Sequence, residues 1–155
     1  MRIALDGVGG DHAPREVVRG AALAVRELDV EIVLVGPEDR LRAEAAEDAA
    51  LFSFVPASEP VAMDEHAAVA ARHKRDSSIA VGLGLVKSGD ADAFVSAGNT
   101  GALLLLAART IPRLPGVRRT ALAAVYPTLP RPHNPDPFAL LLDVESESGK
   151  DVRAE

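Results

Sequence analysis

The sequence predicts an α/β fold, a three-layer α/β/α sandwich built on a mostly parallel sheet. Short apolar runs alternate along the chain with longer segments in which apolar residues recur at helical spacing. The first apolar run ends in a cluster of glycines, which is typical of a buried strand that leads into a loop. Apolar side chains make up 48% of the 155 residues, enough for one compact domain with a single core.

Each element follows from this alternation. The apolar runs predict six strands, over residues 2–6, 31–35, 51–55, 93–95, 120–125 and 138–143. The segments between them predict five helices, over residues 14–28, 38–48, 64–74, 79–87 and 102–111. Pro14 suits a first helical turn, and Ser77 is a candidate cap for the fourth helix. The last two strands are separated by a proline-rich connection instead of a helix.

Composition excludes several classes of function. The net charge is −6, so general attraction to nucleic acid or anionic lipid is not expected. Aromatic residues reach only 3%, which leaves few platforms for stacking bases. The chain has no cysteine, which excludes a disulfide framework and a thiolate nucleophile and fits a reducing, cytoplasmic location. The four histidines lie in unlike contexts, and no metal site or cofactor is predicted.

The loop of residues 96–101 is the strongest candidate for chemistry. A strand leads into it, a helix leads out, and Gly98 and Gly101 allow the backbone to approach a ligand closely. The free N–H groups at a helix start attract anions, and Asn99 and Thr100 could add side-chain donors. The alternative is that Asn99 or Thr100 only caps the helix and that the glycines serve a tight turn.

Two other groups of residues are candidates. Asp11 and His12 could form an acid–base pair, although adjacent residues rarely face the same way and a plain loop role is the alternative. The glycines before them begin like a dinucleotide-binding loop, but His12 stands where the third glycine should be. The basic run that includes Lys74 and Arg75 could dock an acidic partner, or it could be a solvated face.

Several motifs in one order resemble the bacterial phosphate acyltransferases of phospholipid synthesis. The resemblance lies in the segments 1–14, 32–36, 74–78, 91–102, 114–119 and 140–144. It implies a fold related to isocitrate dehydrogenases and phosphotransacetylases. It also implies a homodimeric acyltransferase in which inorganic phosphate attacks a long-chain acyl thioester on acyl carrier protein, giving acyl-phosphate.

The resemblance also assigns roles to residues. With the reaction that it implies, His12, Asp11 and Asn99 become the candidate catalytic residues. It implies a phosphate site made by Gly98, Asn99, Thr100 and Gly101 and a substrate or carrier site made by Lys74, Arg75 and Ser77. Since phosphate is itself the nucleophile, neither serine nor cysteine is required for attack.

The resemblance further implies a truncated domain organisation. Residues 1–144 correspond to the N-terminal part of the family domain, and residues 145–155 form a polar tail that we expect to be disordered. The family's C-terminal half, with the peripheral membrane contact that the resemblance gives it, is expected to be absent. The alternative function is therefore a non-catalytic remnant that binds phosphate or acyl carrier protein.

Overall fold

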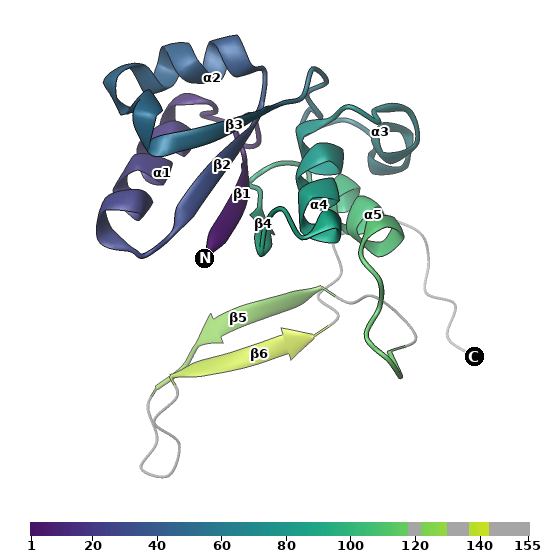
Figure 1. Cartoon of the computed structure of the whole chain (residues 1–155). Helices are drawn as coiled ribbons and strands as arrows, with labels where there is room; N and C mark the ends of the chain where they lie inside the picture. The colour runs from purple at the N-terminus through teal and green to yellow at the C-terminus, as the bar shows by residue number, and fades with distance from the viewer. Residues whose placement is uncertain (118–121, 130–136, 143–155) are drawn as a thin grey trace, which may run out of the picture. The chain divides into compact units, whose positions relative to one another are not determined.

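The computed structural model describes residues 1–117, 122–129 and 137–142. It divides into two compact units, Met1–Pro112 and Arg113–Glu155 (Figure 1). The first unit contains the strands β1 (Arg2–Asp6), β2 (Glu31–Gly36), β3 (Phe52–Pro56) and β4 (Ala93–Val95). Its helices are α1 (Arg15–Glu27), α2 (Glu38–Ala45), η1 (Ala46–Leu51), α3 (Ala67–His73), α4 (Ser78–Ser88) and α5 (Thr100–Thr110).

The four strands of the first unit form one parallel sheet in the order β3-β2-β1-β4. Strand β1 lies between β2 and β4, with Ile3 opposite Ile32 on one side and Ala93 on the other. Five of the six residues of β2 are buried, because a parallel strand covered on both faces requires apolar side chains on both. All four carboxyl ends therefore lie at one edge of the sheet.

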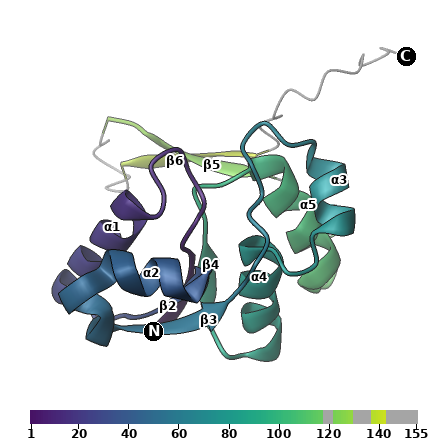
Figure 2. The same ribbon diagram turned by 90° about the horizontal axis from the view of Figure 1, so that it is seen from above.

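Helices cover both faces of this sheet, which confirms the predicted three-layer arrangement (Figures 1 and 2). On one face α1 and α2 pack against β2 and β3, in a core that includes Val18, Leu34 and Leu41. On the other face α4 packs against the sheet, and α5 and α3 pack together beside it around Ile79 and Leu106.

Two helices, α2 and α3, each have a boundary three residues away from the predicted one. The predicted helix over residues 38–48 is an α-helix only as far as Ala45. Ala46 has a positive φ of 46°, which interrupts the α-helix, and a 3₁₀ helix follows. Helix α3 begins at Ala67, three residues later than predicted, because the segment before it forms a loop held by Asn99. No helix among the described residues has the length and apolar character needed to cross a membrane.

The second unit contains β5 (Ala123–Pro127) and β6 (Phe138–Leu142), which pair with each other antiparallel. Strand β5 overlaps the predicted strand at 120–125 and β6 overlaps the one at 138–143, but within the described residues they form a separate two-stranded sheet. A parallel pair needs a crossover of about a dozen residues or more, whereas the ten residues 128–137 that separate β5 from β6 are enough for an antiparallel pair. Some of the predictions lie outside the described residues. These are residues 120 and 121 at the start of one predicted strand, Asp143 at the end of the other, and the expected tail at 145–155.

Candidate functional site

Two glycine-containing loops meet where β1 and β4 end. The strands are neighbours, so the loop after Asp6 and the loop after Val95 leave the sheet side by side. A Cβ added to Gly9 would lie 2.5 Å from Asp6 Oδ2 and 2.9 Å from the backbone nitrogen of Gly98. Only glycine permits this approach, which explains the glycine at position 9.

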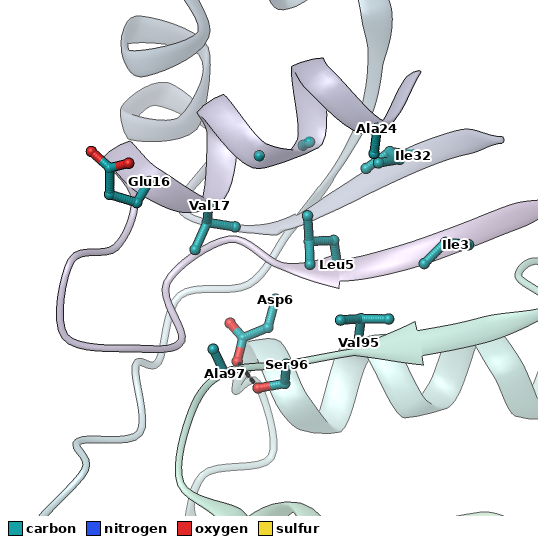
Figure 3. A pocket seen from close by; sticks show the side chains of 12 residues that line it. Ile3, Leu5, Asp6, Glu16, Val17, Ala24, Ile32, Val95, Ser96 and Ala97 are labelled. Carbon is teal, nitrogen blue, oxygen red and sulfur yellow. Dashed lines mark hydrogen bonds between the residues drawn. The ribbon is translucent and has the colours of Figure 1, made fainter. Parts of the chain in front are cut away.

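Asp6 and Ser96 connect the two loops at their bases. Asp6 is 2% exposed, and its Oδ1 accepts a hydrogen bond from the backbone nitrogen of Val8 at 3.2 Å. Its Oδ2 accepts the hydroxyl of Ser96 at 2.7 Å, a contact visible in Figure 3. The hydroxyl oxygen of Ser96 in turn accepts the N–H of Gly98 at 3.0 Å. The last residue of one strand therefore shapes the loop that follows another.

Asn99 is the most heavily engaged of the predicted site residues. Its Oδ1 accepts the backbone N–H of Ala102 at 2.9 Å, which caps helix α5. Its Nδ2 lies within hydrogen-bonding distance of the carbonyl oxygens of Ala62, Met63 and Glu65, at 3.1, 3.3 and 2.9 Å. The cap that the sequence offered as an alternative is thus present, and the side chain also fastens α5 to the loop before α3.

The start of α5 retains backbone donors. Among the described residues, the N–H groups of Thr100 and Gly101 have no hydrogen-bond acceptor, while that of Gly98 is taken by Ser96. Thr100 is exposed and Gly101 is half-buried. A helix of eleven residues places partial positive charge at this end, so an anion here would meet both unused donors and the helix dipole.

Two of the predicted carrier-binding residues, Lys74 and Ser77, support the segment that contacts the side chain of Asn99. Lys74 Nζ lies 2.5 Å from Glu65 Oε2 and 2.6 Å from the carbonyl oxygen of Pro60. The hydrogen bond from Lys74 lowers the pKa of Glu65 below its ordinary value. Ser77 is fully buried, donates to the carbonyl oxygen of Lys74 at 2.9 Å and caps α4 through the N–H of Ala80.

Asp76 and Ser58 continue this support. The Asp76 carboxylate accepts both the backbone N–H and the hydroxyl of Ser58, and these hydrogen bonds lower the pKa of Asp76. The motif at residues 74–78 and the loop at 96–101 are therefore linked through the segment 58–65. Arg75 is exposed and so remains accessible to a partner.

Asp11 and His12 have exposed side chains in the turn between Gly10 and α1. Neither side chain has a hydrogen bond or ion pair with another described residue, so the structure does not couple them as an acid–base pair. Gly10 approaches Ala97, and an added Cβ would lie 3.3 Å from the Cβ of Ala97. Among the described residues no group of three histidine, aspartate or glutamate side chains could hold a metal ion.

An apolar hollow of about 340 Å³ adjoins the bases of the two loops (Figure 3). Its walls come mainly from α1 and β1, and include Leu5, Val17 and, from the end of β4, Val95. Asp6 and Ser96 lie at its polar end. Apolar walls do not attract an anion, so the loops and the start of α5 remain the candidate anion site.

Sequence reasoning did not predict a role for the side chains of Asp6 and Ser96. A signal was present, because each is the first polar residue after an apolar strand and each stands within a few residues of glycines. Polar side chains at the carboxyl ends of neighbouring parallel strands can meet. The order of strands, which brings β4 next to β1, was the missing information.

Comparisons with known proteins agree with the sequence motifs. The chain is 45% identical over 146 residues to a phosphate acyltransferase of Desulfitobacterium hafniense, a match that covers 93% of this chain and 42% of the relative. It is 49% identical to a phosphate acyltransferase of Koribacter versatilis over 93% of this chain and 40% of the relative. For a phosphate acyltransferase of Thermoanaerobacter pseudethanolicus the identity is 44%, with coverage of 99% and 44%.

The chain thus spans less than half the length of these curated relatives. A family model described as "Fatty acid synthesis protein" matches residues 1–153, nearly the whole sequence. From this match and the identities above, the chain belongs to the fatty acid synthesis protein family.

Proposed function

We propose that this chain is the N-terminal part of a phosphate acyltransferase that transfers a long-chain acyl group from acyl carrier protein to inorganic phosphate. The observation that carries the proposal is the identity of 44–49% to relatives named phosphate acyltransferase. The product, acyl-phosphate, would serve phospholipid synthesis. Residues 1–144 would supply the phosphate-binding part of the family domain, and the remaining length of the relatives would complete the substrate cleft.

The geometry at the start of α5 supports a phosphate site. Phosphate has several acceptor oxygens, and the N–H groups of Thr100 and Gly101 are donors without another described acceptor. Asn99 would hold the helix start in place instead of donating to the anion, because both ends of its side-chain amide already contact the protein. Gly98 would contribute through its close packing against Gly9.

The proposed reaction needs positioning more than a protein nucleophile. A phosphate oxygen attacks the thioester carbonyl carbon, a C–O bond forms, and the C–S bond breaks as the carrier thiolate leaves. Donors that stabilise the tetrahedral oxyanion lower the barrier to this attack. His12, which is exposed beside the loops, is the candidate that would deliver a proton to the leaving thiolate.

Acyl carrier protein would dock on the basic surface at the end of α3. Arg75 is exposed there, whereas Lys74 is held by Glu65 and Ser77 is buried, so we assign direct contact to Arg75 and support to the other two. A cytoplasmic location fits the absence of cysteine. The homodimer and the peripheral membrane contact through the C-terminal half rest on the resemblance to the family.

The test is phosphate-dependent release of free acyl carrier protein from a long-chain acyl carrier protein, with formation of acyl-phosphate. The Thermoanaerobacter pseudethanolicus relative is assayed in parallel as the positive control. Release that rises with phosphate concentration supports the proposal. Calorimetric binding of phosphate without turnover would favour the non-catalytic alternative. If the chain shows no phosphate binding and no turnover, both the acyltransferase and the non-catalytic alternative are contradicted.

A further inference from the structure

The side chains of Asp6, which is buried, and Ser96, which is half-buried, connect the two loops of the candidate site. We infer that Asp6 and Ser96 are positioning residues for the candidate phosphate loop, and this inference rests on the proposed function. Asp6 is 2% exposed at the end of β1, and Ser96 stands directly after β4. Their side chains are 90 residues apart in the sequence and 2.7 Å apart in space. The pair thereby fixes one loop relative to the other.

The chemistry of the two side chains gives the contact a direction. A carboxylate only accepts hydrogen bonds, so the single hydroxyl proton of Ser96 points to Asp6. The lone pairs of the hydroxyl oxygen then face the N–H of Gly98, which they accept at 3.0 Å. Asp6 therefore acts on Gly98 through Ser96, and a reversed hydroxyl would present a proton to that N–H.

Gly98 links the Asp6–Ser96 pair to the start of helix α5. It directly precedes Asn99, whose side chain caps α5, and the unused N–H groups of Thr100 and Gly101 follow. Gly98 also packs so closely on Gly9 that an added Cβ would lie 3.4 Å from the Gly9 Cα and 3.3 Å from Asp6 Oδ2. A loop fixed by one directed hydrogen bond and one close contact presents its donors in a single orientation, which is what preorganised anion binding requires.

The alternative is that the pair serves only stability. Such a role would lower the melting temperature of a variant and leave phosphate affinity unchanged in the folded protein. The positioning role predicts a loss of affinity that persists well below the melting temperature. Isosteric and hydroxyl-preserving variants distinguish the two, because Ser96→Thr keeps the hydroxyl that Ser96→Ala removes.

The experiment is calorimetric titration of the whole chain with inorganic phosphate, for the wild type, Ser96→Ala, Ser96→Thr, Asp6→Asn and the control Ser88→Ala. Ser88 is exposed and is the last residue of α4. Like Ser96, it donates a hydrogen bond to an aspartate, in this case Asp90, at 2.6 Å. Circular dichroism confirms that each variant is folded at the titration temperature.

The expected result is that Ser96→Ala and Asp6→Asn weaken phosphate binding about tenfold, the equivalent of one hydrogen bond that orients the loop. Ser96→Thr and Ser88→Ala should stay within about twofold of the wild type. Amide hydrogen exchange of Gly98 should accelerate in Ser96→Ala and in Asp6→Asn even without phosphate. This second measurement remains informative if one of the two variants does not fold.

Failure of the inference and failure of the proposed function look different. If the wild type binds phosphate and folded Ser96→Ala binds it equally well, the positioning role is wrong and the proposed function stands. If Ser96→Thr loses as much affinity as Ser96→Ala, the hydroxyl is not the cause and the role is again wrong. If the wild type does not bind phosphate at all, both are overturned.

Discussion

Replacing Asn99 with alanine should destabilise the first unit by about 3 kcal/mol. The side chain is 7% exposed, so water cannot take over its contacts. Loss of a helix cap costs about 1 kcal/mol. The two N–H groups of Nδ2 serve three carbonyl oxygens, and the loss of two net hydrogen bonds costs about 1 kcal/mol each. For a domain of this size the melting temperature should fall by roughly 10 °C.

The assay is urea unfolding followed by circular dichroism, with two further variants that separate the terms. Asn99→Ser keeps a capping oxygen but cannot reach across to the loop before α3, so about 2 kcal/mol of the loss should remain. Thr100→Ala is the matched control, since this exposed neighbour should change stability by less than about 0.5 kcal/mol. If Asn99→Ala is no more destabilising than Thr100→Ala, the claim that Asn99 fastens the helix to the loop is refuted.

Three further predictions concern other parts of the site. Gly9→Ala should destabilise the protein by more than about 1 kcal/mol in urea unfolding, because its Cβ would meet a carboxylate oxygen at 2.5 Å and a backbone nitrogen at 2.9 Å. The control Gly20→Ala has open space around the added Cβ and should be neutral or stabilising. Because Lys74 lowers the pKa of Glu65 from 4.5, the stabilisation that Glu65 gives the folded state is present above that pH and lost as pH falls through the lowered value. The difference in unfolding free energy between the wild type and Glu65→Gln should therefore shrink below pH 4.5, and a difference independent of pH would contradict this. Arg75→Glu should weaken acyl carrier protein binding several-fold at low salt without changing phosphate affinity, and unchanged carrier binding would exclude this docking surface.

The layer architecture could be predicted from local patterns because each element is encoded over a few residues. A buried parallel strand such as β2 must be apolar along its length, and Ser77 has the side chain and position of a helix cap. The antiparallel pairing of β5 with β6 was not anticipated, because pairing direction depends on which strands meet and local patterns do not contain that information. The interruption of the helix at Ala46 was not predicted, because no glycine or proline stands at that position.

The candidate site could be predicted only in part for the same reason. The loop at 96–101 has a local signature, since glycines between a strand and a helix indicate close backbone approach. The contact between Asp6 and Ser96 joins residues far apart in sequence, and it follows only from the placement of β4 beside β1. The three carbonyl oxygens around Asn99 come from a loop without any regular element, so no periodicity could indicate them.

The most direct test of the anion site is a titration of the isotope-labelled chain with inorganic phosphate, followed by the amide resonances in nuclear magnetic resonance spectra. The amides of Thr100 and Gly101 should shift progressively with phosphate, while that of Gly89, the left-handed cap at the far end of α4, should not. Chloride at the same ionic strength controls for general salt effects. Saturable shifts confined to the start of α5 are the result expected; amides at 100 and 101 that do not respond, or that respond equally to chloride, would contradict the account.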